Sequence, residues 1–234
     1  MNGYAAREHS VDCGALYESI RRDLISVVLA ADPSDLEALV AATPEWRVRD
    51  VVAHVTGIAE DLNAGNFGDG DPDAFTRVQV VRHQDSPLPE VIATWDREAP
   101  QFEAGLRLLG YQIGNHFVGD LFIHFVDVVT TLGHPVDRDS TAVWVSLDWY
   151  LDALEAAETG DDRGALEVIT GPERRIIGSG EVSASVMAAP FEILRACAGR
   201  RSAAQIARFD WSGESDLFQP RLSQYSTPSI DVTD

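Results

Sequence analysis

The chain has 234 residues, is 45% hydrophobic and carries a formal net charge of −20 at pH 7. This length and apolar content suffice for one large domain or two small ones with a buried core. The negative charge argues against a broad surface for nucleic acid or anionic membranes, and the nearest candidate for a membrane span, residues 24–31, is far too short.

The N-terminal residues and the two cysteines indicate the cellular compartment. Charged Arg7, Glu8 and Asp12 stand where a signal peptide would carry its apolar region. The two cysteines, Cys13 and Cys197, lie far apart without paired spacing. We therefore expect a cytoplasmic protein with reduced thiols and without a cysteine nucleophile.

The first half of the chain shows the helical period. The capping pattern Ser34-Asp35-Leu36-Glu37 predicts a short helix through Val40. Residues 63–87 are rich in Gly and Asp and predict a loop, with no calcium site because Pro72 interrupts the Asp spacing and no closing Glu follows. Longer helices, which together predict an antiparallel bundle, are expected over residues 8–30, 43–58, 88–109 and 113–132.

The pattern changes after residue 137, where short strand-like segments mix with helices. From residue 213 the sequence is polar, and we expect an extended or disordered tail over 213–234. The domains predicted are a helical bundle over 1–137 and a smaller α+β domain over 138–212. Within the second domain, helices are expected over 142–157 and, with an interruption at Gly199, over 190–207, and strands over 165–169, 174–177 and 182–186.

Asp120 and His124 are the first candidate site residues. They lie one helical turn apart in the longest apolar run after residue 100, and Asp127 projects from the same face. A carboxylate and an imidazole in this spacing can bind one metal ion, with a further ligand from elsewhere in the chain. His116, four residues before Asp120, shares that face and is an alternative ligand.

The chain resembles the mycothiol-dependent maleylpyruvate isomerase family of actinobacteria, whose N-terminal half belongs to the DinB-like helical bundles. The resemblance covers roughly residues 10–213 and implies an α-rich α+β fold with a DinB-like four-helix bundle. It is carried by three stretches in the family's order, residues 43–54 (TPEWRVRDVVAH), 120–128 (DLFIHFVDV) and 191–202 (FEILRACAGRRS), with Asp210-Trp211.

The resemblance implies a divalent metal, usually zinc, held by one histidine of the second bundle helix and by a Glu-x-x-x-His pair. On the matching positions these ligands are His54, Asp120 and His124. Aspartate stands where the family's enzyme carries glutamate. Its shorter side chain requires a closer helix or a weaker bond to the metal.

The chemistry that the resemblance implies uses mycothiol as a cosubstrate. A thiol at the open position of a three-ligand zinc site loses its proton at neutral pH. Its addition to an activated double bond allows rotation before the thiol leaves. Asp127 would orient a ligand histidine or move a proton.

Arginines are the candidates for binding substrate or thiol anions. Arg195, Arg200 and Arg201 belong to a locally basic segment, and Arg82 lies in the predicted loop. Guanidinium groups bind carboxylates in a planar, bidentate way. The alternative for these residues is a structural role, in balancing the acidic bundle or joining the domains.

Three functions remain open at this point. The first is a metal- and mycothiol-dependent isomerase or transferase that acts on a small electrophile. The second is a non-catalytic metal-binding or interaction protein, because of the change at Asp120. The third is a metal-dependent hydrolase with bound water as nucleophile. The expected partners are small molecules in each enzymatic case, and the sequence leaves open a monomer or a homodimer.

Overall fold

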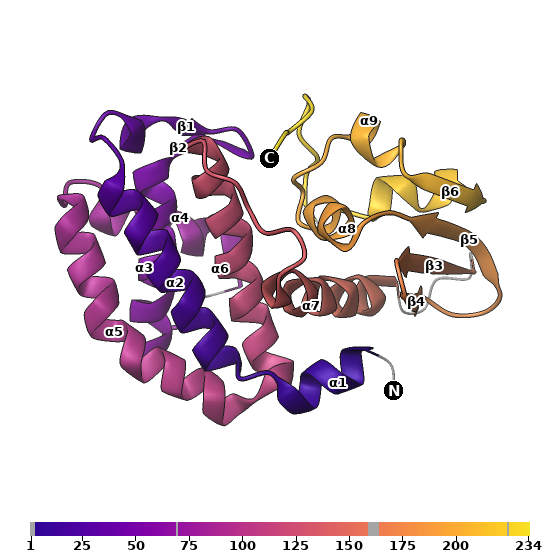
Figure 1. Cartoon of the computed structure of the whole chain (residues 1–234), viewed down its shortest axis with the longest axis horizontal. Helices are drawn as coiled ribbons and strands as arrows, with labels where there is room; N and C mark the ends of the chain where they lie inside the picture. Colours follow the sequence, from indigo (N-terminus) through magenta and orange to yellow (C-terminus); the bar gives the residue numbers. More distant parts are fainter. Residues whose placement is uncertain (1–2, 69, 159–163, 224) are drawn as a thin grey trace. The chain divides into compact units, whose positions relative to one another are not determined.

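The structure, a computed structural model, describes residues 3–68, 70–158, 164–223 and 225–234 (Figure 1). It divides into two compact units, Val11–Val136 and a second formed by Asp137–Thr233 together with the N-terminal segment up to Ser10. The second unit therefore includes α1 (Gly3–Ser10), which the sequence assigns to the first domain. The Arg7 side chain holds α1 there, because it pairs with Asp148 and Glu173 at 2.7 Å each.

The first unit is a bundle of long helices, as the sequence predicts. Leu24, Val52, Trp95 and Leu121 are at most 1% exposed in its core. None of the described helices is long and apolar enough to cross a membrane. The helices that pack on one another in Figure 1 are α2 (Cys13–Ala30), α3 (Val48–Asn63), α5 (Leu88–Leu109) and α6 (Tyr111–Thr131).

Three predicted helix starts are wrong. The helix expected over 8–30 is broken before α2, where the Asp12 side chain accepts a hydrogen bond from the Ala15 N–H and caps the new helix. The segment expected to be helical from residue 34 has only a 3-10 turn, η1 (Asp35–Glu37). A hairpin follows, formed by β1 (Leu39–Val40) and β2 (Thr43–Arg47), so the helix expected from residue 43 begins only at Val48. β1 has only two residues and β2 does not alternate between buried and exposed positions, so neither gives a strand pattern in the sequence.

The predicted loop over 63–87 contains a helix, α4 (Pro72–His83). Asp71 caps it by accepting a hydrogen bond from the Ala74 N–H, and Pro72 occupies its first turn. The buried residues of α4 are Gln79 and His83. Because these are polar, hydrophobic periodicity gives no signal for this helix.

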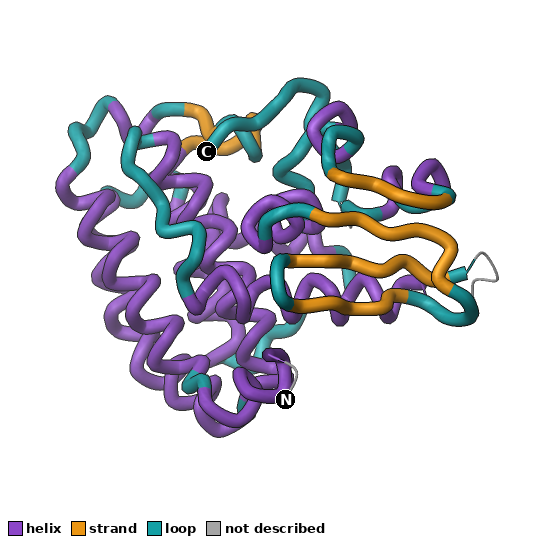
Figure 2. Tube along the Cα trace, turned by 45° about the vertical axis from the view of Figure 1, so that its right-hand side comes forward, coloured by secondary structure: helices purple, strands orange, loops and turns teal. Residues whose placement is uncertain are grey.

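The second unit combines a mixed sheet with helices, so the predicted α+β class is confirmed. Figure 2 shows its strands side by side in the order β4-β3-β5-β6, with β3 and β5 parallel and the other pairs antiparallel. The three predicted strands are present as β3 (Ala165–Thr170), β4 (Glu173–Ile177) and β5 (Val182–Met187). The sequence did not predict the edge strand, β6 (Asp210–Gly213).

Helices and a structured C-terminus complete this unit. The interruption expected at Gly199 is present, and the left-handed φ of 74° at this residue follows the end of the first helical piece. The segment predicted as a tail contains two 3-10 turns and buries Phe218, Leu222 and Val232. The remaining elements are α7 (Thr141–Glu158), α8 (Pro190–Cys197), α9 (Ala203–Ile206), η2 (Ser215–Leu217) and η3 (Gln219–Arg221).

Candidate metal site

His54 is positioned by the packing of α3. The helix starts where the Asp50 carboxylate accepts a hydrogen bond of 2.9 Å from the Arg47 N–H. Val51 and Val55 are at most 1% exposed and fix the inner face of the helix. His54 lies beside this face with 5% of its surface exposed, so its ring enters the bundle rather than the solvent.

Asp120 and His124 are positioned by α6, which packs against α3. They lie one turn apart on this helix, which ends at Thr131 before Gly133, a glycine with the left-handed φ of 77°. His124 is 7% exposed, whereas the Asp120 side chain is 30% exposed. The carboxylate is therefore the member of this pair that solvent reaches.

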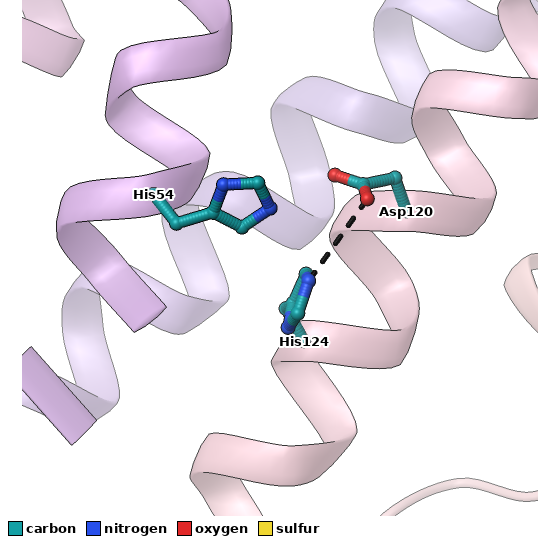
Figure 3. Close-up of side chains that lie close together, drawn as sticks. All are labelled: His54, Asp120 and His124. Atoms are coloured by element: carbon teal, nitrogen blue, oxygen red, sulfur yellow. Dashed lines mark ion pairs between the residues drawn. The ribbon is translucent and has the colours of Figure 1, made fainter. Parts of the chain in front are cut away.

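These three side chains converge, as Figure 3 shows. One ligand atom from each of His54, Asp120 and His124 lies within 4.8 Å of the other two. His124 Nε2 is 3.9 Å from Asp120 Oδ1, and the centroids of the two imidazole rings are 4.9 Å apart. Two imidazoles and a carboxylate are a donor set that suits zinc and other divalent transition metals.

Trp46 of β2 covers both imidazoles. Its ring centroid is 5.2 Å from that of His54 and 6.0 Å from that of His124, with the second pair stacked. Trp46 therefore packs directly on the histidine pair. An indole here forms an apolar wall that limits the access of water to the site.

The His54 ring is held from its other side by α4. His54 Nδ1 is 2.8 Å from Gln79 Oε1, and Gln79 Nε2 donates to Asp61 Oδ2 at 3.0 Å. Asp61 also accepts from Arg82 at 2.6 Å. Burial acts to raise the pKa of Asp61, but hydrogen bonds from Gln79, Arg82 and Asn66 outweigh it and hold the pKa below its usual range.

Neither Gln79 nor Asp61 was predicted to be near the site. Gln79 is fully buried and Asp61 is 4% exposed. Without the helix α4 in the prediction, nothing in the sequence brings residue 79 close to residue 54. A buried glutamine in a segment rich in Gly and Asp has no pattern that would distinguish it from a loop residue.

Asp127 and His116 were the other candidates on α6. Asp127 is buried, and its Oδ2 is 3.7 Å from His124 Nδ1, on the side of the ring away from Asp120. This separation exceeds a hydrogen bond but places a carboxylate against the imidazole. His116 is exposed, stacks on Phe117 and is not a member of the converging group.

The candidate arginines already have carboxylate or backbone partners. Arg82 pairs with Glu60 as well as Asp61, so its charge is engaged between α3 and α4. In the second unit, the Arg201 side chain holds Glu192 through two hydrogen bonds of 2.7 and 3.1 Å. Arg200 donates to the Ala198 carbonyl, and Arg195 is fully buried.

Both cysteines are buried and poorly suited to nucleophilic chemistry. Burial raises the pKa of the Cys13 thiol to about 11, and the neighbouring Asp12 charge adds to the shift. Burial raises the pKa of Cys197 to about 12. Because the thiolate is the reactive form, both groups are inert near neutral pH.

Comparison with known proteins supports the fold. The fold matches the crystal structure of the mycothiol-dependent maleylpyruvate isomerase with a TM-score of 0.57, at 14% identity over 80% of this chain and 88% of that one. A histidine-to-alanine mutant of that isomerase gives 0.55 at 12% identity, with the same coverage. No curated protein matches the chain in sequence. Residues 17–112 match the model of the mycothiol maleylpyruvate isomerase N-terminal domain, and the chain as a whole has a fold similar to that of the isomerase.

Proposed function

We propose that the protein is a metal- and mycothiol-dependent isomerase or transferase that acts on a small electrophile. The observation that carries this proposal is the convergence of His54, Asp120 and His124, with ligand atoms within 4.8 Å of one another. The family of residues 17–112 and the fold of the maleylpyruvate isomerase support the class of chemistry.

The charge of the donor set favours an anionic further ligand. A divalent ion, two neutral imidazoles and one carboxylate together carry a net charge of +1. A zinc ion with three protein ligands supplies an open coordination position, at which a thiol loses its proton near neutral pH. A thiolate at that position would neutralise the remaining charge of the site.

The nucleophile in this proposal comes from outside the protein. Cys13 and Cys197 are buried and belong to different units, and the pKa of each thiol is raised by burial. The partly exposed Asp120 gives the site an open side, while the two histidines form its buried wall. A small thiol such as mycothiol and a small electrophile could both approach from that open side.

The neighbouring residues have defined tasks in the proposed site. Asp127, with its carboxylate 3.7 Å from His124 Nδ1, keeps the opposite nitrogen of that ring directed at Asp120. Trp46 excludes water from above the imidazoles. The exclusion of water protects a thiolate from hydration and strengthens the electrostatic interactions inside the site.

The test combines metal analysis with turnover. The protein is purified without chelators or a metal-affinity tag, its metal content is measured, and maleylpyruvate or another activated alkene is supplied with and without mycothiol. We expect about one divalent metal per chain and turnover that requires the thiol. His124→Ala should abolish metal retention, and retention at the wild-type level would refute the site.

Other outcomes distinguish the alternative functions. Stoichiometric metal without turnover of any electrophile would indicate a non-catalytic metal-binding protein. Activity that persists without a thiol would indicate a hydrolase.

A further inference from the structure

We propose that Gln79 is a positioning residue that determines which nitrogen His54 offers to the metal. The inference rests on the proposed metal site and adds to it a residue from α4, outside the ligands themselves. Gln79 lies between His54 and Asp61, fully buried, with one end of its amide against each.

The orientation of the Gln79 amide follows from Asp61. An ionised carboxylate only accepts hydrogen bonds, so the amide nitrogen of Gln79 must face Asp61 Oδ2. Hydrogen bonds from Asn66 at 3.0 Å and from Arg82 at 2.6 Å keep Asp61 in this ionised form. The amide oxygen of Gln79 is thereby directed at His54.

This orientation selects one tautomer of His54. Because Gln79 Oε1 can only accept, His54 Nδ1 must carry the hydrogen at their separation of 2.8 Å. In a neutral imidazole with its hydrogen on Nδ1, Nε2 is the nitrogen that carries the lone pair with which a histidine binds a metal. Figure 3 shows that the ring points from α3 toward the Asp120 and His124 side chains, which is the direction in which a ligand nitrogen is needed.

The backbone of α3 is adapted to this contact. A Cβ atom at Gly57, one turn after His54, would lie 2.6 Å from the Cβ and 3.3 Å from the Cα of Gln79. Such distances are too short for packed carbon atoms, so α4 approaches α3 this closely only because residue 57 is glycine. The Arg82 pairs with Glu60 and Asp61 fix the same two helices one turn further along.

The first test is a metal titration of Gln79→Leu against wild type, with a chelating dye as competitor for zinc. We expect Gln79→Leu to weaken zinc binding by about 10–100-fold, the usual effect of removing the outer partner of a ligand histidine. Gln101→Leu, which makes the same change at an exposed position of α5, should bind as wild type does. Equal affinity in Gln79→Leu and wild type would overturn the inference.

A second variant separates hydrogen bonding from packing. The double variant Asp61→Asn with Gln79→Glu exchanges the amide and the carboxylate. The carboxylate at residue 79 would still accept a hydrogen bond from His54, and the amide at residue 61 would donate one to the carboxylate at residue 79. We expect this double variant to bind zinc within a few fold of wild type. Affinity as weak as that of Gln79→Leu would show that the hydrogen bond is not what positions the ring.

The tautomer can also be observed without metal. Nitrogen-15 NMR of the wild-type apoprotein above pH 8 should show His54 with its hydrogen on Nδ1. A hydrogen on Nε2 would overturn the inference, even if Gln79→Leu fails to fold. If wild type binds no zinc but the Nδ1 tautomer is present, the metal site fails and the role of Gln79 in orienting the ring stands.

Discussion

Changing Asp120 to glutamate should preserve or strengthen metal binding. In a tetrahedral zinc site with bonds of 2.0–2.2 Å, neighbouring ligand atoms lie about 3.4 Å apart. His124 Nε2 and Asp120 Oδ1 are 3.9 Å apart, so these two atoms must approach each other by about 0.5 Å when metal binds. Glutamate adds one carbon–carbon bond, about 1.5 Å of side-chain length, which exceeds this gap.

The difference in burial between His124 and Asp120 determines which of the two side chains can move toward a bound metal. His124 is 7% exposed and lies between Asp127 and Trp46, so a shift of its ring would disturb packed neighbours. The Asp120 side chain is 30% exposed and can accept a longer residue without overpacking. The added methylene therefore extends the carboxylate toward the metal, with little strain on the bundle.

The assay is a competition titration with zinc on Asp120→Glu, Asp120→Ala and wild type. Asp120→Ala removes a proposed ligand. It should therefore weaken zinc binding more than Gln79→Leu does, for which a loss of about 10–100-fold is expected. Asp23→Glu, the same change on the exposed face of α2, is the matched control and should leave affinity unchanged. If both substitutions at Asp120 leave the affinity at the wild-type value, residue 120 is a surface carboxylate and not a ligand.

Three further predictions concern stability and reactivity. Arg21→Met should lower the free energy of unfolding in urea by about 3–5 kcal/mol, because it leaves the buried Glu103 carboxylate without its partner at 2.9 Å. Burial already raises the pKa of Glu103, so this loss of stability should become smaller as the pH falls and the carboxyl group takes up a proton. Cys13 and Cys197 should react with a thiol reagent at pH 7.5 only after unfolding, and rapid labelling of the native protein would contradict the raised pKa values. In the metal-free protein, Asp61→Asn should lower the free energy of unfolding by about 1–2 kcal/mol at neutral pH. Hydrogen bonds outweigh burial and lower the pKa of Asp61, so the stability that its carboxylate contributes is lost as the pH falls through the native pKa. The unfolding curves of wild type and Asp61→Asn should therefore converge in acid.

The long helices were predictable because their buried faces are apolar. In α5, Val91, Trp95 and Phe102 recur at helical spacing and are at most 5% exposed. The same rule fails for α4, whose buried residues Gln79 and His83 are polar. A helix whose buried side makes hydrogen bonds is therefore missed by a method that detects buried apolar surface.

The candidate site, like the fold, was predictable only where local sequence patterns bring its residues together. Local spacing on one helix brings Asp120 and His124 together without knowledge of the tertiary structure. The position of His54 relative to this pair depends on the packing of α3 against α6, which the spacing of residues in the sequence does not reveal. His54 is predicted as a ligand only from the family resemblance. Gln79 depends on a contact between α3 and an unpredicted helix, so no route from the sequence led to it.

Burial within the proposed site leaves the carboxylate as the member of the group with the most room to change. His54 is fixed by Gln79 and covered by Trp46, so a change there would leave buried polar groups unpaired. His124 is enclosed in the same way, with Asp127 against its ring. Of the three proposed ligands, Asp120 has the most exposed side chain, at 30%, and a shorter or longer side chain there should alter the distance to a bound metal without opening a cavity in the bundle. The fold therefore constrains the two histidines strongly and the carboxylate weakly, and in the proposed site a change between aspartate and glutamate should alter the metal affinity more than the stability of the protein.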